Sequence, residues 1–143
     1  MNLLPNTAAI VSRFLRDQPE VTALVDERVY TILPNSKTYP LVRVTRVGGA
    51  PGTEFAYWLD APLFQVDVWA DTTAAAFDVI ETCRAVLVQR LTGVHTFTGV
   101  SGVVTSVAAG GITEGFDPDN PQKARDRFDV VVHAHPIPEL TSS

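Results

Sequence analysis

The spacing of apolar residues near the N-terminus predicts one short amphipathic helix. Apolar side chains recur at three- and four-residue intervals, at Ile10, Val11, Phe14 and Leu15. Asn6 or Thr7 is suited to cap the first turn, and Pro19 follows the last apolar position. Because proline is tolerated at the start of a helix, residues 20–25 are predicted to form a second helical turn.

From residue 29 onward, alternation with a period of two predicts strands. They are expected at residues 29–32, 41–47, 63–70, 102–108 and 127–135. The alternation is clean in 63–70, where Phe64, Val66 and Val68 share one face. Gln65, Asp67 and Trp69 share the other face. This strand is therefore predicted to be half-buried.

A longer helix is predicted between the third and fourth of these strands. Its apolar stripe runs through Ala76, Ile80, Cys83, Leu87 and Leu91, and is widened by Phe77, Val79 and Val86. Asp71 or Thr72 is suited to cap the start, and Gly93 stands where a left-handed residue would end the helix.

The predicted order of elements, α-β-β-β-α-β-β, indicates an α+β fold. Consecutive strands joined without a helix are usually antiparallel, so we expect a mainly antiparallel sheet of four to five strands with the helices packed on one face. A chain of 143 residues suits a single domain, 1–143, in which residues 137–143 are expected to form a flexible C-terminal tail.

Charged side chains are predicted on the sheet face away from the helices. Arg43, Asp67 and Asp129 would project there from three different strands. They could pair across the strands, which would help to set the register. Alternatively, this face lies against a neighbouring subunit or a solvent channel, an interpretation that Trp69 on the same face supports.

Two long connections are rich in glycine and proline. They span residues 48–60 and 109–123, and compact domains seldom keep such loops without a use. We expect them to extend as flaps whose aromatic side chains contact a partner protein. These side chains are Phe55, Tyr57, Trp58 and Phe116.

Charge and cysteine content limit the possible partners. The formal net charge of −5 argues against a surface that binds nucleic acid by neutralising phosphates. The single Cys83 excludes an intramolecular disulfide and a multi-cysteine zinc site, and its place on an apolar helical stripe is typical of an inert buried thiol. No apolar segment approaches the roughly 20 residues that span a bilayer, and no membrane partner is expected.

No group of residues predicts catalysis. His133 and His135 share a strand face with the spacing of some metal sites, but no third ligand is evident. The Asp117–Asn120 segment lacks the later glycine and glutamate of a calcium loop and is predicted to be a turn. No phosphate-binding loop is present in the sequence. We therefore expect a protein that is not an enzyme and has no cofactor or metal.

Four segments in this order resemble the tail terminator and tail-to-head joining (tail completion) proteins of long-tailed bacteriophages. They are LVDERVY at 24–30, YPLV at 39–42, FQVDVWA at 64–70 and RFDVVV at 127–132. The resemblance covers nearly the whole chain and lies in the order of the elements.

The resemblance implies a structural virion protein that forms a hexameric ring at the head-proximal end of the tail. Such a ring would stop growth of the tail tube, join the tail tube protein ring to the head connector protein, and let the genome DNA pass without specific binding. Assembly would take place in the host cytoplasm. The alternatives are a head-completion or connector subunit, a small ligand-binding or enzymatic α/β domain that uses the two histidines, and a regulatory binding module.

Overall fold

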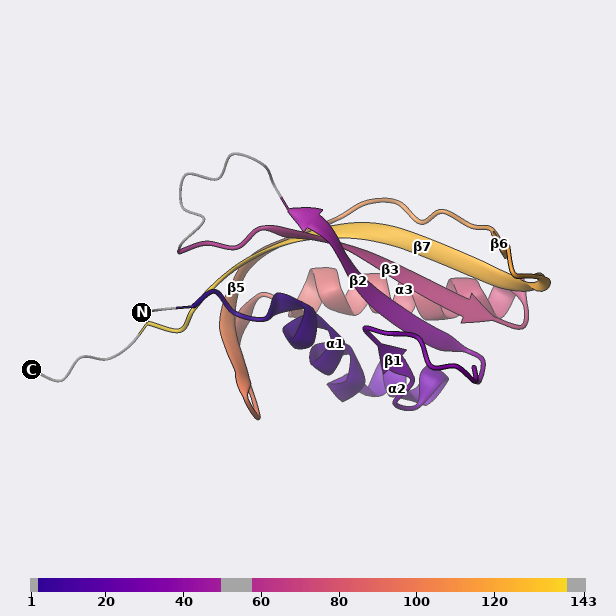
Figure 1. Ribbon diagram of the computed structural model, residues 1–143, viewed down its shortest axis with the longest axis horizontal. Coiled ribbons are helices and arrows are strands. Elements are labelled where there is room, and N and C mark those ends of the chain that lie inside the picture. The colour runs from indigo at the N-terminus through magenta and orange to yellow at the C-terminus, as the bar shows by residue number, and fades with distance from the viewer. Residues whose placement is uncertain (1–2, 50–57, 139–143) are drawn as a thin grey trace, which may run out of the picture.

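The computed structural model describes residues 3–49 and 58–138. In these ranges the helices are α1 (Thr7–Asp17), α2 (Pro19–Val25) and α3 (Thr73–Arg90). The strands are β1 (Val29–Tyr30), β2 (Leu41–Gly49), β3 (Pro62–Ala70), β4 (Gly93–Phe97), β5 (Val100–Ala109), β6 (Phe116–Asp117) and β7 (Asn120–His135). Figure 1 shows the three helices together below β2, β3 and β7. The α+β class is therefore confirmed.

The strands form one sheet in the order β1-β2-β3-β7-β5-β4, with β6 paired to β7. β1 runs parallel to β2, and the other pairs are antiparallel. The expected count of four to five strands is wrong, because the described residues form seven. β4 and β6 were not predicted. β6 has only two residues, and Val94 of β4 is exposed to solvent, so the apolar residues of β4 do not mark a buried face.

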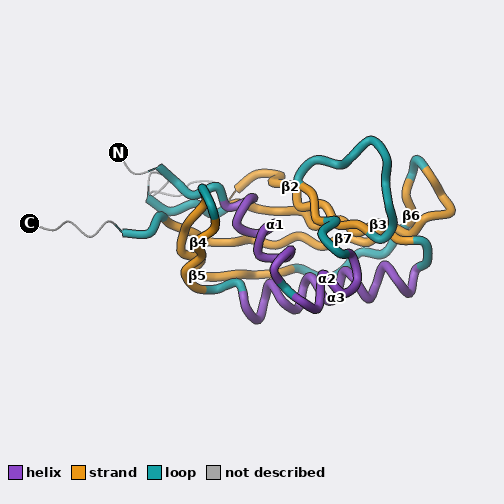
Figure 2. The backbone as a smooth tube through the Cα atoms, turned by 90° about the horizontal axis from the view of Figure 1, so that it is seen from below, coloured by secondary structure: helices purple, strands orange, loops and turns teal. Residues whose placement is uncertain are grey.

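The sheet curls around the helical layer. A register shift between Val104 and Ser106 interrupts the pairing of β5 with β7, and such a bulge bends a strand. β5 consequently turns down beside α1, and the helices stay on one side of the sheet (Figures 1 and 2). We call the opposite, helix-free side the outer face. The core between sheet and helices includes Ile10, Leu15, Phe64, Ile80, Leu87 and Phe128.

The two N-terminal helices form as predicted. The Asn6 side chain accepts a hydrogen bond from the backbone N–H of Ala9, which satisfies one of the free donors at the start of α1. Pro19 occupies the first turn of α2. The apolar stripe of α1 is buried, so this helix is held by packing as well as by its cap.

The long helix α3 is also present, with two differences from the prediction. Thr72 caps it by accepting from the N–H of Ala75, and its predicted central stripe is buried. Phe77 does not widen that stripe: it is 43% exposed, because it lies on the solvent side of the helix. The helix ends at Arg90, and Gly93, with φ of 137°, begins β4 and is not the helix cap.

The connection at 109–123 is not a free flap. Thr113 and Arg127 exchange backbone hydrogen bonds, and the N–H of Arg125 donates to the carbonyl of Gly115. β6 and the turn at Pro118 and Asp119 then lead directly into β7, which begins seven residues earlier than expected. The segment thus lies along β7, because the backbone groups of this strand beyond β5 need partners. The predicted turn at 117–120 is confirmed.

The other predicted strands and loops differ in extent. The strand expected at 29–32 ends at Tyr30, and Ile32 is exposed. β2 reaches Gly49, so the connection at 48–60 begins later than predicted, and residues 50–57 of it lie outside the described ranges. Residues 139–143 of the expected C-terminal tail also lie outside them. No helix in the described ranges is long and apolar enough to cross a membrane.

The N-terminal segment approaches β5 closely at Gly102. A Cβ atom at this position would lie 2.9 Å from the Cβ of Pro5 and 3.0 Å from the Cδ1 of Ile10. Real Cβ atoms do not come this close to carbon, so only glycine allows the present contact between β5 and the start of α1.

Candidate interaction surface

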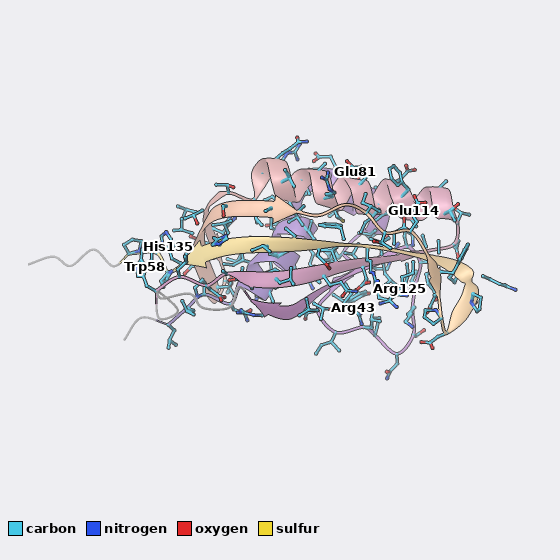
Figure 3. All side chains as sticks on the ribbon, turned by 90° about the horizontal axis from the view of Figure 1, so that it is seen from above. Arg43, Trp58, Glu81, Glu114, Arg125 and His135 are labelled. Atoms are coloured by element: carbon cyan, nitrogen blue, oxygen red, sulfur yellow. The ribbon has the colours of Figure 1, made fainter. Side chains whose placement is uncertain are left out.

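The outer face of the sheet carries three rows of side chains that cross β2, β3 and β7. Directly paired residues of an antiparallel sheet point to the same side, so each row lies on one face. The rows are Leu41, Trp69 and Arg125; Arg43, Asp67 and Arg127; and Thr45, Gln65 and Asp129. The prediction that Arg43, Asp67 and Asp129 share the helix-free side therefore agrees with the strand register. Figure 3 shows Arg43 and Arg125 over the middle of this face.

Asp67 is the centre of a charged network. Its carboxylate accepts hydrogen bonds from Arg43 at 3.2 Å and from Arg125 at 3.2 and 3.3 Å. The Gln65 amide also donates to it, at 3.2 Å. Asp67 is 0% exposed, and these donors replace the water that burial removes from its carboxylate.

Trp69 lies between the same two arginines. The Arg43 and Arg125 guanidinium carbons lie 5.1 and 4.9 Å from the centre of the indole, within the range of cation–π attraction. Trp69 is only 3% exposed. The prediction of a half-buried β3 is therefore wrong for Asp67 and Trp69, because arginine side chains cover them on the outer face.

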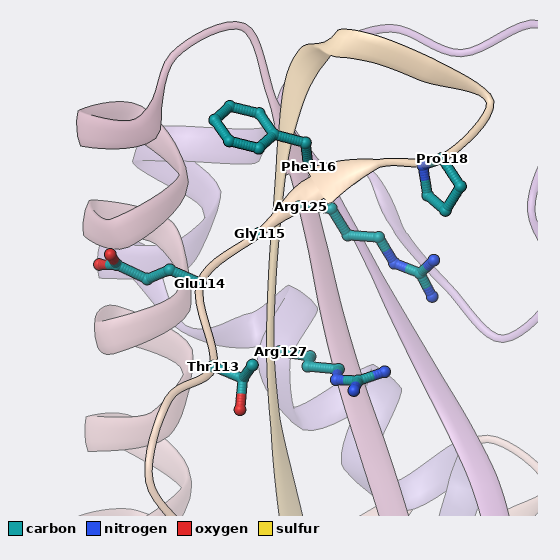
Figure 4. A pocket seen from close by; sticks show the side chains of 7 residues that line it. All are labelled: Thr113, Glu114, Gly115, Phe116, Pro118, Arg125 and Arg127. Atoms are coloured by element: carbon teal, nitrogen blue, oxygen red, sulfur yellow. The ribbon is translucent and has the colours of Figure 1, made fainter.

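Arg127 and Asp129 are the charged residues of these rows that stay exposed. Neither forms an ion pair within residues 3–49 and 58–138. Two hollows of about 260 and 240 Å³ meet at Arg127 and Thr113. Figure 4 shows Arg125 and Arg127 extending in the same direction from β7.

Phe116 stands at the rim of the larger hollow. It is 63% exposed and lies on β6, on the segment that runs beside β7. In Figure 4 its ring points away from Arg125, so the aromatic and basic groups lie on different sides of this segment. The structure places Phe116 where a neighbouring molecule could reach it; its role as a partner contact remains a prediction.

A second exposed aromatic group lies at the other end of β7. Trp58 stacks on His135, with ring centres 5.2 Å apart and an interplanar angle of 6°, yet Trp58 is still 51% exposed. His133 contacts the hydroxyl of Ser106 at 2.9 Å. The two histidines therefore have separate local partners. Phe55 and Tyr57 lie outside the described residues.

Asp60 secures the chain beside Trp58. Its carboxylate accepts two hydrogen bonds from the Arg46 guanidinium, at 2.7 and 2.8 Å, and one from the Thr7 hydroxyl at 3.4 Å. The Asp60 carboxylate raises the pKa of Arg46. This contact joins β2 and the start of α1 to the segment that precedes β3.

Two buried groups, a thiol and a carboxyl, have raised pKa values. Burial raises the pKa of the Cys83 thiol to about 12, which makes it a poor nucleophile and agrees with the predicted inert thiol. Burial, and secondarily the negative charge of Glu114, raise the pKa of Asp126. One Asp126 oxygen has no hydrogen-bond partner. Within the described residues, no three His, Cys, Asp or Glu side chains are grouped so as to hold a metal.

Comparison with known proteins identifies the family. A family model described as tail completion protein gp17 matches residues 8–128, from α1 into β7. The chain belongs to the tail completion protein gp17 family. It is thus a structural protein of the bacteriophage tail, as the order of its sequence segments predicted.

The fold of this tail completion protein also occurs in a solved particle. A chain described as part of the virion of a native gene transfer agent (GTA) particle matches with a TM-score of 0.57 and 17% sequence identity. The match covers 90% of this chain and 92% of that chain. At this identity the likeness shows the shared fold alone. None of the curated proteins compared with the chain matches it.

Sequence reasoning found part of the outer face of this tail completion protein and missed the rest. It identified Arg43, Asp67 and Trp69, which the structure joins in one network. The alternation in 127–135 placed Arg127 on the same side as Asp129 without giving it a role. Arg125 was missed, although the same alternation extended by one pair of residues would have included it. Asp129 and Trp58 were identified but do not belong to the network.

Proposed function

We propose that this tail completion protein forms a closed ring of about six copies at the head-proximal end of the phage tail. The ring ends growth of the tail tube, contacts the last ring of tail tube protein, and presents its other side to the head connector protein. The family match over residues 8–128 carries this proposal. The protein is accordingly a virion component that assembles in the host cytoplasm.

The distribution of exposed apolar side chains supports a role in assembly. Trp58, Phe77, Val94 and Phe116 are each more than 40% exposed and lie on separate parts of the chain. A ring subunit has two neighbours in the ring and others above and below it, so it needs contact surfaces on several sides. We propose Trp58 and Phe116 as contacts with adjoining proteins, together with Phe55 and Tyr57.

The overall charge supports passage of the genome through the ring. The chain has a formal net charge of −5, so the lumen of a ring of such subunits is not expected to hold DNA tightly. We accordingly propose that genome DNA passes through without specific binding.

The test uses purified protein alone and with purified tail tubes. We expect light scattering and negative-stain microscopy to show a closed oligomer of about six copies, either in solution or on the ends of tubes. Added protein should also stop tube elongation at substoichiometric amounts. A protein that stays monomeric, leaves tube ends bare and does not change tube length would overturn the proposal.

The same experiment distinguishes the proposed ring protein from a head-completion or connector subunit. A connector subunit would bind purified connector and leave tube ends bare, whereas the proposed ring protein binds tube ends. For the ligand-binding or enzymatic alternative, replacement of His133 and His135 by alanine is informative. Full assembly activity of that double variant agrees with a structural protein.

A further inference from the structure

The outer face has a charge that differs from that of the whole chain. Its rows contain three guanidinium groups and two carboxylates, and one of these carboxylates, Asp67, is fully enclosed. Asp129 is exposed beside Arg127, so these rows carry one net positive charge, whereas the chain carries a formal net charge of −5. A partner for this face should be acidic.

Arg127 is the group on this face that is free to bind such a partner. It lies directly opposite Asp67 in the register of β3 and β7. The Asp67 carboxylate is nevertheless occupied by Arg43, Arg125 and Gln65. Arg127 is consequently left exposed without an ion pair among the described residues, at the point where the two hollows meet (Figure 4).

An acidic end of the same chain has the matching charge. Asp17, Glu20, Asp26 and Glu27 are all exposed at the end of α1, on α2 and in the turn before β1. Asp26 pairs with Arg28, and Glu20 pairs with Arg90.

Asp17 and Glu27 are the carboxylates of this end that form no ion pair within residues 3–49 and 58–138, and Glu27 is the one that lies in the turn before β1. The preceding residue, Asp26, has a φ of 53°, so the chain turns sharply there. Glu27 therefore lies at the tip of a turn, where a second molecule can reach it.

We infer that the Arg127 hollow of one copy binds Glu27 of a second copy. This inference rests on the proposed ring. In Figure 1, α2 and β1 lie on the opposite side of the molecule from the outer face. A contact between two different surfaces repeats from copy to copy, and it closes into a ring when the rotation between copies allows. Because both groups are solvent-exposed before contact, the attraction weakens at high ionic strength.

Charge reversal tests this contact. Arg127→Glu places two carboxylates against each other, and Glu27→Arg places two guanidinium groups together. We expect each variant, when it is not mixed with the other, to have an affinity between copies that is lower by about tenfold or more. Sedimentation or light scattering measures this affinity, both in solution and on tail tubes. In an equimolar mixture every contact regains opposite charges when the two variants alternate, so assembly should return. A ring with an even number of copies permits that alternation.

Two controls have the same changes in net charge. Lys37→Glu and Asp78→Arg alter side chains outside the proposed contact, and both variants should assemble as the wild type does. Circular dichroism checks that each variant is folded. A second measurement uses Arg127→Cys mixed with Glu27→Cys in a Cys83→Ala background, which should give a disulfide between copies under mild oxidation.

The outcomes separate this inference from the proposed function. Wild-type rings together with normal assembly of Arg127→Glu would overturn the inference and leave the ring intact. Loss of assembly in both variants without recovery in the mixture, or equal loss in the controls, would also overturn it. A wild-type protein that never assembles, even on tail tubes, would overturn both proposals.

Discussion

Asp67 and Trp69 lie two residues apart on β3 and are held by the same two arginines. Arg43 comes from β2 and Arg125 from β7, and each both donates to the carboxylate and covers the indole. The network therefore joins the three central strands in one register, because a slip of one residue in any of them would move its members to the opposite face.

Replacing Asp67 by asparagine should destabilise the protein strongly. The change leaves Arg43 and Arg125 partly buried without a counter-charge, and breaking such a pair costs about 3 kcal/mol. Urea unfolding followed by circular dichroism measures the change. Asp129→Asn is the matched control on the same face, and its effect should stay within about 0.5 kcal/mol. Equal stability of the two variants would contradict the role given to Asp67.

The two tryptophans should differ in their access to solvent. Trp69 is covered by guanidinium groups, whereas half of Trp58 is exposed. We expect iodide to quench the fluorescence of Trp69→Phe, in which Trp58 remains, and to have little effect on Trp58→Phe. If Trp58 also contacts an adjoining protein, its quenching should fall when the protein is bound to tail tubes. Equal quenching of both variants in the free protein would contradict the buried position of Trp69.

Cys83 should be unreactive in the folded protein. Its pKa is raised to about 12, so at pH 8 the thiol is protonated as well as buried. We expect a disulfide reagent to label it only after unfolding in urea. In the unfolded chain the thiol ionises more readily than in the folded protein. Its contribution to the free energy of unfolding is therefore complete below about pH 8.5 and should decline between about pH 8.5 and about pH 12. In Cys83→Ala this part of the decline in stability should be absent. Rapid labelling of Cys83 in the native protein would contradict the prediction.

Asp126 should make stability rise under mild acid. Its pKa is raised by burial and by Glu114, so the folded state binds a proton more readily than the unfolded state. The corresponding contribution is complete below the unfolded value and is lost as the pH rises through the folded value. Asp126→Asn, which resembles the protonated side chain, should therefore be more stable than the wild type at pH 7.

The advantage of Asp126→Asn should disappear near pH 3.5. Glu114→Gln serves as the comparison, because it removes the smaller of the two causes and should give a smaller gain at pH 7. Thermal unfolding across this pH range measures both variants. A constant difference between Asp126→Asn and the wild type at all pH values would show that titration of Asp126 is not responsible.

Local patterns in the sequence were sufficient to predict the helices and the central strands. The stripe of α1, its Asn6 cap and the alternation around Val66 depend only on neighbouring residues, and these predictions were confirmed. β4 was missed because its Val94 faces solvent, so its alternation does not mark a buried face. The parallel pairing of β1 was missed because a strand of two residues has almost no pattern of its own.

The candidate site depended on contacts between distant parts of the chain. Strand periodicity placed Arg43 and Asp67 on one face, but Arg125 lies 58 residues from Asp67, and their contact depends on the register set by the turn before β7. The stacking of Trp58 on His135 and the approach of Pro5 to Gly102 have the same origin. No local pattern encodes such pairs, since these residues become neighbours only when the strands pair in the folded sheet.

The central position of β3 affects how the molecule carries mechanical load. β3 is paired along nearly its whole length with β2 on one side and β7 on the other. A pull along this strand would strain both ladders in shear, so many backbone hydrogen bonds and the Asp67 ion pairs would have to break together. β1 and β4, each with one neighbour, would separate first. A joint built on β3 would therefore resist tension better than one built on either edge of the sheet.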